Sequence, residues 1–229
     1  MEQLPLGVFL RERATFEAFV IGHNLELVSR LRDAAARPAR FAGWLWGGAG
    51  CGRSHLLQAV CAAAPPGEGV AYLPLRELGA AAGEFLGRAP GPAVLCLDDV
   101  DAVVGDPAIE RALFAAFQRL DERGGRIIAA AGCAPHGLAW RLADIASRFA
   151  ASEIFQVRAL DESGQQEALR RRAAERGFEL PEETMRYLLR RFPRDMTTLG
   201  RLLDEIDTAG LRAQRRLTVP FVRGILGDP

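Results

Sequence analysis

A glycine-rich stretch over residues 47–52 carries the most specific chemical pattern in this sequence. Gly47 and Gly52 stand five residues apart, and Arg53 and Ser54 follow them directly before an apolar helical pattern. This order is the GxxxxG[K/R][S/T] pattern of a P-loop, in which backbone N–H groups and the start of a helix hold phosphate oxygens. The candidate phosphate-binding residues are Gly47, Gly48, Gly50, Cys51, Gly52, Arg53, Ser54 and His55.

Arginine occupies the position at which this motif normally has lysine. The planar guanidinium of Arg53 is not equivalent to a compact ammonium group, so we expect the chain to hold a nucleotide and to hydrolyse it slowly. A compositional bias is the alternative explanation, because the sequence contains no lysine and all 29 basic residues are arginine. Ser54 is expected to bind Mg²⁺ through its hydroxyl. For His55 a structural role is the alternative.

Two acidic residues form a second pattern further along the chain. The apolar run over residues 93–97 ends in the paired carboxylates Asp98 and Asp99. After a P-loop, an apolar strand with this ending is typical of a Walker B motif. Asp98 is then expected to bind Mg²⁺, directly or through water, and Asp99 to orient or deprotonate the attacking water.

Two arginines are further candidates for contact with phosphate. Arg148 lies in the Ser-Arg-Phe sequence 147–149, after a short helical pattern, and can serve as an arginine finger that reaches a nucleotide on a neighbouring subunit. Arg194 stands at the start of a later helix, where it can contact bound phosphates. An ordinary surface ion pair is the alternative role for each.

The elements that must position these residues alternate between apolar runs and helical patterns. Such alternation predicts βαβ units and therefore an α/β domain with a parallel sheet. Continuous apolar runs fit strands that are buried on both faces. We expect strands over residues 41–46, 70–75, 93–97 and 126–131, with helices over 25–36, 54–63 and 109–120.

The second half of the chain has helical patterns alone. Ser163 and Gln166 suit a capping box at a helix start, Gly177 suits the end of that helix, and Pro181 suits a first-turn position in the next. We therefore expect a small helical lid behind the nucleotide domain. The expected division is a tail over residues 1–14, an α/β nucleotide-binding domain over 15–158 and a lid over 159–229.

Composition limits the classes of protein that the chain can be. The formal net charge is zero and 49% of the residues are hydrophobic, which is ordinary for a globular protein and gives no general sign of nucleic-acid binding. No run approaches the roughly 18 apolar residues of a membrane span, and the start lacks the pattern of a secretory signal. Four scattered cysteines without a CxxC pair favour reduced thiols over a zinc site. We therefore expect a cytoplasmic protein.

The order of P-loop, paired aspartates and two arginines resembles the AAA+ module of the bacterial replication initiator DnaA. Three longer segments, residues 15–24, 176–181 and 215–222, are most similar to the Hda-type regulators of that family. The resemblance implies an adaptor that binds ADP, attaches to the DNA-loaded β sliding clamp of DNA polymerase III and stimulates hydrolysis of the ATP held by DnaA. Such an adaptor negatively regulates the initiation of chromosome replication.

The resemblance also implies roles for particular residues. Val20 and Ile21 would lie near the nucleobase, Arg148 would be the finger offered to DnaA, and Arg194 would be a second sensor of the nucleotide. A clamp-binding peptide would lie in the tail, with Gln3, Leu4 and Leu6 as its contact residues.

Two segments depart from the family pattern. Gly7 and Val8 replace the expected end of the clamp-binding peptide, so Val8 or Phe9 is the alternative apolar anchor. Residues 132–136, Gly-Cys-Ala-Pro-His, replace an Asp-Arg-Pro sequence after the fourth strand. The second departure removes an acid and an arginine, which again indicates weak hydrolysis in this chain's own site.

Two other functions remain open at this point. A self-sufficient AAA+ ATPase of the helicase-loader type is favoured by Asp99 and disfavoured by Arg53 and Cys133. A DNA-binding initiator is disfavoured, because no net basic excess is present and the sequence ends at Pro229 directly after the lid. We accordingly expect no direct sequence-specific DNA binding and no membrane partner, and leave a homo-oligomer open.

Overall fold

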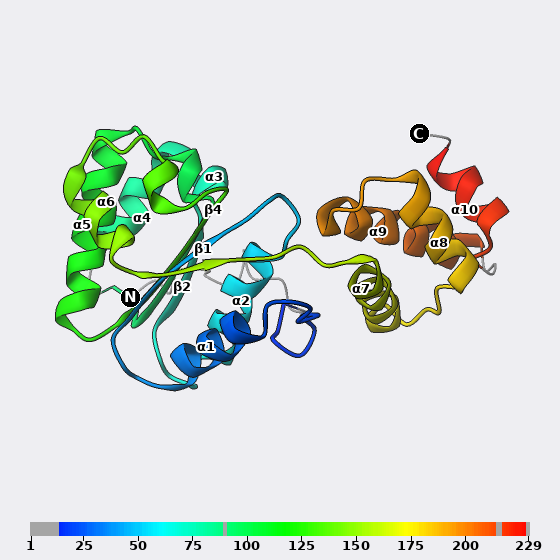
Figure 1. Ribbon diagram of the computed structural model, residues 1–229, viewed down its shortest axis with the longest axis horizontal. Coiled ribbons are helices and arrows are strands. Elements are labelled where there is room, and N and C mark those ends of the chain that lie inside the picture. The colour runs from blue at the N-terminus through cyan, green and yellow to red at the C-terminus, as the bar shows by residue number, and fades with distance from the viewer. Residues whose placement is uncertain (1–13, 89–90, 214–216, 228–229) are drawn as a thin grey trace. The chain divides into compact units, whose positions relative to one another are not determined.

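The computed structural model describes residues 14–88, 91–213 and 217–227. The chain divides into two compact units: the first holds the residues up to Gly48 together with Arg53–Arg158, and the second holds Ala49–Gly52 together with the residues from Ala159 on. The first contains a parallel sheet with helices on both faces, and the second contains helices (Figure 1). The α/β fold class with a helical lid, expected from the alternating pattern, is confirmed.

The sheet of the first unit positions the P-loop and the paired aspartates at one edge. Its five described strands are all parallel and lie in the order β2-β3-β4-β1-β5. Because parallel strands end at the same edge, the residues after β1 and β3 share that edge. The strands are β1 (Phe41–Trp46), β2 (Val70–Pro74), β3 (Val94–Asp98), β4 (Arg126–Ala131) and β5 (Glu153–Gln156).

Helices cover both faces of this sheet. In Figure 1, α1 and α2 lie on one face, and α4, α5 and α6 lie on the other. Every residue of β3 and β4 is buried between these layers, as the continuous apolar runs predicted. The helices are α1 (Leu25–Ala36), α2 (Arg53–Ala63), α3 (Leu75–Leu78), α4 (Ala82–Gly87), α5 (Pro107–Glu122) and α6 (Ala143–Ala150).

An aromatic cluster fills the core under β1. The Trp44 ring is fully buried and lies 4.9 Å from the Phe149 ring, while Trp140 stacks on Phe149 at 5.8 Å. The indole N–H of Trp44 donates to the Cys133 carbonyl at 3.0 Å. These tryptophans therefore pack the interior and fix the turn after β4.

A buried arginine joins β4 to the end of α1. The guanidinium of Arg126 donates to the carbonyl oxygens of Ala34, Ala35 and Arg37, and it pairs with the Glu68 carboxylate. The last carbonyls of a helix have no partner within the helix and attract a positive charge. Arg126 supplies both the donors and the charge while only 2% of its side chain is exposed.

The second unit packs its helices around a separate apolar core. Its helices are α7 (Glu162–Glu175), α8 (Glu182–Arg191), α9 (Met196–Ala213) and α10 (Val219–Leu226). Leu188, Leu199 and Leu203 are fully buried at its centre. The apolar helix faces that the sequence predicted therefore form the core of this unit.

The capping box expected at Ser163 and Gln166 is wrong. Asp161 caps α7 instead, since its side chain accepts from the Gly164 N–H at 2.8 Å, and the Ser163 hydroxyl donates to the same carboxylate. An aspartate at the preceding position is at least as good a cap acceptor as serine, so the helix begins earlier. Gly177 ends the helix as predicted, with φ of +81°.

Replacing Arg126 by methionine tests the junction of β4 and α1. The variant leaves Glu68 and three carbonyls without their donor, so the free energy of unfolding should fall by about 3 kcal/mol. Urea denaturation measures this change. Arg88→Met is the control, because Arg88 forms an exposed pair with Glu84 and should change stability by less than about 0.5 kcal/mol. Equal losses of stability in the two variants would contradict the proposed role of Arg126 in joining β4 to α1.

Candidate functional site

The loop between β1 and α2 has the backbone conformation that phosphate binding requires. Gly50 has φ of +70° and Gly52 has φ of +104°, which side-chain-bearing residues rarely adopt. The chain therefore curls before α2 begins at Arg53. The first N–H groups of α2 have no partner within the helix and carry the positive end of its dipole, so this end suits an anion.

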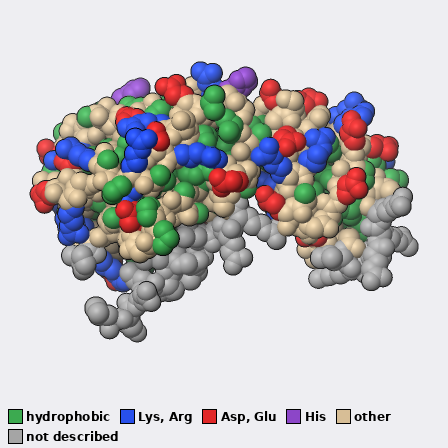
Figure 2. Space-filling model, turned by 90° about the horizontal axis from the view of Figure 1, so that it is seen from below, with side chains coloured by type: hydrophobic (Ala, Val, Ile, Leu, Met, Phe, Trp, Pro, Cys, Tyr) green, Lys and Arg blue, Asp and Glu red, His purple; other side chains and the backbone are tan. Residues whose placement is uncertain are grey.

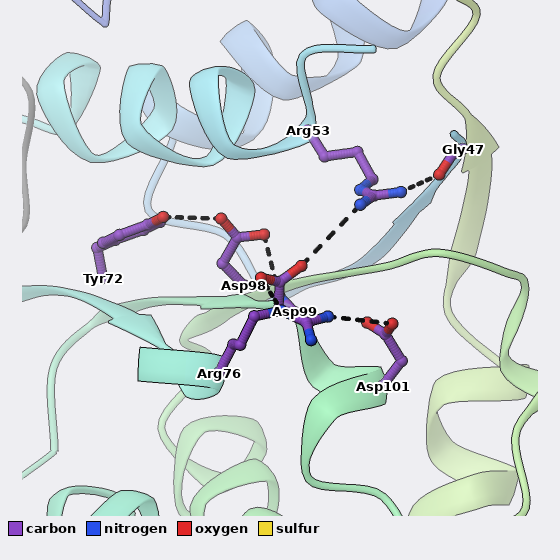
Figure 3. A network of polar contacts seen from close by, with 7 residues as sticks. All are labelled: Gly47, Arg53, Tyr72, Arg76, Asp98, Asp99 and Asp101. Carbon is purple, nitrogen blue, oxygen red and sulfur yellow. Dashed lines mark hydrogen bonds and ion pairs between the residues drawn. The ribbon is translucent and has the colours of Figure 1, made fainter. Parts of the chain in front are cut away.

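Arg53 lies between the loop and the paired aspartates. Its Nη1 donates to the Gly47 carbonyl oxygen, and its Nη2 lies 4.0 Å from Oδ1 of Asp99 (Figure 3). Only 14% of the Arg53 side chain is exposed. The structure thus brings the P-loop arginine and the second Walker B acid together, while Ser54 is exposed at the start of α2.

Asp98 is a buried carboxylate at the end of β3, with 4% of the residue exposed. The Tyr72 hydroxyl donates to its Oδ2 at 2.7 Å, and the Asp99 N–H donates to its Oδ1 at 3.0 Å. Burial and the neighbouring Asp98 carboxylate raise the pKa of Tyr72 well above its ordinary value, so the phenol keeps its proton and remains a donor. Tyr72 comes from the adjacent strand β2, and it fixes the orientation of Asp98.

Asp99 holds an unusual backbone conformation beside this carboxylate. Among the described residues, it alone has a positive φ without being glycine, with φ of 51°. Its Oδ2 accepts from Arg76 Nε at 2.9 Å, and Arg76 Nη2 lies 3.6 Å from Asp101 (Figure 3). The Asp99 carboxylate therefore lies between two guanidinium groups, those of Arg76 and Arg53.

The side chain of Arg148 packs against α5. It stands in the last turn of α6 itself rather than after a helix, as the sequence had suggested. Its guanidinium lies 5.1 Å from the Phe114 ring centre, 5.4 Å from that of Phe117 and 3.7 Å from the Asp121 carboxylate. These partners all belong to α5, so the structure groups Arg148 with that helix and not with Arg53 and Asp99.

A buried glutamate that sequence reasoning missed fixes the start of α6. Glu110 is fully buried, and its carboxylate accepts from the N–H groups of Gly105, Arg141 and Leu142. The last two lie directly before α6, so Glu110 determines where the helix that carries Arg148 begins. Glu110 stands beside the apolar face of α5, and this position was a weak signal in the sequence that the residue is buried.

Comparisons with known proteins agree with this architecture. Residues 161–226 match the family model for the lid domain of Hda. Domain III of the Thermotoga maritima replication initiation protein DnaA is 21% identical, with a TM-score of 0.83 and coverage of 96% of this chain and 98% of that chain. The chain therefore has the fold of DnaA domain III, and its residues 161–226 match the lid domain of Hda. These matches confirm the resemblance to DnaA and Hda that the sequence indicated.

Other solved structures share the fold. AMPPCP-bound DnaA from Aquifex aeolicus is 24% identical, with a TM-score of 0.73 and coverage of 91% of this chain and 69% of that chain. The Thermotoga maritima RuvB Holliday junction branch migration motor is 14% identical, with a TM-score of 0.60 and coverage of 89% and 68%. At these identities the likeness concerns the fold.

Within the Hda lid, Arg194 is held by its own unit. Its Nε donates to the Leu189 carbonyl at 3.0 Å, and its Nη1 donates to Glu162 at 2.9 Å. The side chain is nevertheless 50% exposed. Contact of Arg194 with a nucleotide stays a prediction.

The segment before α1 is anchored at both of its ends. The Asn24 side chain exchanges two hydrogen bonds with the backbone of Arg158, at 2.9 and 2.8 Å. His55 Nε2 lies 2.7 Å from the Thr15 carbonyl oxygen, and the His55 ring packs on Phe19 at 5.4 Å. These contacts give His55 a structural role, and they hold the half-buried candidates Val20 and Ile21 beside α2.

Several expectations depend on residues or surfaces outside this cluster. Gln3, Leu4 and Leu6 lie outside the described residues. Within the described ranges, no helix is long and apolar enough to cross a membrane. On the face shown in Figure 2, basic and acidic side chains are interspersed, which agrees with the zero formal net charge of the sequence.

Substituting phenylalanine for Tyr72 tests the support of Asp98. The variant removes a hydrogen bond to a buried carboxylate, so the free energy of unfolding should fall by about 2 kcal/mol. Chemical denaturation provides the measurement. Tyr187→Phe is the matched control, because in the described structure the Tyr187 hydroxyl is buried without a hydrogen-bond partner. Its removal should be neutral or stabilising, and an equal loss from both variants would refute the assignment to Tyr72.

Proposed function

We propose that this chain is a nucleotide-bound adaptor that docks on the DNA-loaded β sliding clamp and stimulates hydrolysis of the ATP held by DnaA. In this role it negatively regulates the initiation of replication. The observation that carries the proposal is the combination of an Hda lid with a P-loop whose Arg53 faces Asp99. The proposed organisation is a clamp-binding tail over residues 1–14, a nucleotide domain over 15–158 and a lid over 159–229.

ADP or ATP suits the loop between β1 and α2. Gly50 and Gly52 shape that loop, and the first N–H groups of α2 lie at its end. Arg53 would exchange its bond to the Gly47 carbonyl for phosphate oxygens, which a guanidinium binds well. The likeness to DnaA structures with bound AMPPCP supports this proposal.

The donor set also fits a magnesium ion that arrives with the nucleotide. Each oxygen of Asp98 accepts one hydrogen bond and keeps a lone pair for a metal-bound water, and Ser54 supplies a hydroxyl. No group of three His, Cys, Asp or Glu residues suited to a metal occurs among the described residues. Mg²⁺ commonly completes such incomplete sets with phosphates and water, and there it would neutralise phosphate charge.

Weak hydrolysis in the chain's own site follows from the partners of Asp99. A catalytic base must accept a proton from water through a free lone pair at hydrogen-bonding distance. Asp99 already accepts from Arg76 at 2.9 Å and faces Arg53 at 4.0 Å. The two cations therefore stabilise the charged carboxylate and weaken it as a base, and a catalytic water must compete with Arg76 for Oδ2.

Arg148 is proposed to act on the nucleotide of DnaA. Its guanidinium packs over two rings of α5, and 32% of its side chain is exposed. A positive charge delivered to the γ-phosphate stabilises the charge that develops in the transition state. The clamp supplies proximity, because it gathers the adaptor and DnaA on the same DNA.

ADP binding can be tested by thermal unfolding. Saturating ADP with Mg²⁺ should raise the melting temperature, since a ligand of the folded state stabilises it by mass action. The chain's own ATP turnover should be at or below about 0.01 s⁻¹. Arg53→Ala should lose most of the ADP-induced shift, and Arg88→Ala should keep it. An unchanged melting temperature of the unaltered protein at saturating ADP and ATP would remove nucleotide binding from the proposal.

The proposed finger can be tested by following the conversion of DnaA-bound ATP to ADP on clamp-loaded DNA. Arg148→Ala should remove most of the stimulation, because fingers of this type contribute roughly 10³–10⁵-fold in rate. Arg148→Lys should restore little, since lysine lacks the planar fork. ADP binding and clamp binding should be unchanged in both variants.

A companion variant separates the finger from docking. Replacing Gln3 and Leu4 by alanine should abolish capture on clamp-loaded DNA and, with it, the stimulation of DnaA. The ADP-induced thermal shift should be unaffected, because the tail is not part of the proposed nucleotide site. Full stimulation by the Arg148→Ala variant would leave the arginine finger unassigned. Unchanged capture of the tail variant on clamp-loaded DNA would disprove the assignment of Gln3 and Leu4 to a clamp-binding peptide.

A self-sufficient ATPase of the helicase-loader type is the second candidate. The carboxylate of Asp99 at the end of β3 favours it, because that group can act as a base once its arginine partners move. Sustained turnover near 1 s⁻¹ without DnaA would support this candidate over the adaptor.

A further inference from the structure

Arg76 links two acidic residues beside the proposed nucleotide site. It follows β2 directly, in the short helix α3, and its Nε donates to Asp99 Oδ2 at 2.9 Å. Its Nη2 lies 3.6 Å from Asp101. Figure 3 shows the Arg76 guanidinium between these two carboxylates, with Arg53 approaching Asp99 from the opposite side.

We propose that Arg76 is a positioning residue that competes with the attacking water for the Asp99 carboxylate and so suppresses hydrolysis in the chain's own site. The inference rests on the proposed nucleotide binding and adds a cause for the slow turnover. Its consequence is that ADP or ATP can remain bound as a structural cofactor.

The geometry of Asp99 gives this restraint a physical basis. A φ of 51° and a ψ of 48° are uncommon for a residue with a side chain, so the direction of its carboxylate is narrowly set. One oxygen accepts from Arg76 and the other faces Arg53. A water that approaches Oδ2 of Asp99 must compete with the hydrogen bond from Arg76, and the positive charge of Arg53 also attracts the carboxylate.

The charge of Arg76 is itself secured by this contact. The hydrogen bond to Asp99 raises the pKa of Arg76 above its ordinary value, and the charges of Asp99, Asp101 and Asp98 act in the same direction. Arg76 is therefore a permanent cation at the second Walker B acid. Because it faces two carboxylates, its charge is already balanced without a phosphate.

Exposure limits the size of the expected effect. The Arg76 side chain is 60% exposed, and ion pairs of this kind are worth a factor of about five in an equilibrium or a rate at most. Release of Asp99 should accordingly raise ATP turnover about two- to fivefold, with the KM for ATP unchanged. The reaction remains slow in absolute rate because Arg53 is still present.

The test compares ATP turnover of the full chain and its Arg76→Gln variant, with ADP-induced thermal shifts measured in parallel. Arg76→Lys should restore suppression in part, because it returns the positive charge without the fork. The double variant Arg76→Gln with Asp99→Asn should return to the low rate. Arg186→Gln is the control, since Arg186 is 56% exposed and pairs with Glu182 at 2.6 Å in the lid.

The outcomes separate this inference from the proposed function. A rise in kcat for Arg76→Gln that disappears in the double variant supports the positioning role. An unchanged or lower kcat with normal ADP binding overturns it and leaves the adaptor function intact. A lower kcat would assign Arg76 to phosphate contact. Absence of ADP binding in the unaltered protein overturns both.

Discussion

The burial of the Asp98 carboxylate is the constraint on which the rest of the site depends. A charge at the end of a fully buried strand is costly unless hydrogen bonds satisfy it. One bond comes from Tyr72 on the adjacent strand, and the other from the N–H of Asp99. The second bond accompanies the left-handed turn at Asp99, and that turn directs the next carboxylate toward Arg53 and Arg76. A single desolvated group thus organises two strands, one turn and two arginines.

Local patterns in the sequence predicted the strands, loop and helix around the candidate site, because these elements lie in short contiguous segments. The P-loop glycines, the apolar run before Asp98 and the helix after Arg53 all follow from spacing within a few residues. Strand β5 was missed, because its four residues are mostly exposed and the sequence around Ile154 does not alternate between apolar and polar residues. The prediction of a capping box at Ser163 was wrong because two possible cap acceptors lie within one turn. Asp161, the earlier of the two, caps the helix.

Hydrogen bonds that pair a buried charge with groups far along the chain could not be predicted in the same way. Glu110 and Arg126 are charged residues without any sequence mark that distinguishes them from surface charges, yet both are buried. Most of their partners lie tens of residues away and are backbone groups. A chain with arginine as its only strongly basic side chain favours such arrangements, because one guanidinium can donate in several directions within a plane. Arg126 shows this use fully, with three carbonyls and one carboxylate as acceptors.

The hydrogen bonds between Asn24 and Arg158 also bear on how the protein is made. They join residues that are 134 positions apart and thereby close the first unit from its first helix to its last described residue. Contacts of such separation form late in folding, because the entropy of a long loop must be overcome first. During synthesis, Asn24 has no partner until Arg158 has left the ribosome, by which time the lid is already being translated. Until then, the segment that carries Val20 and Ile21 has only its anchor at His55, so this segment reaches its final position late in the folding of the unit.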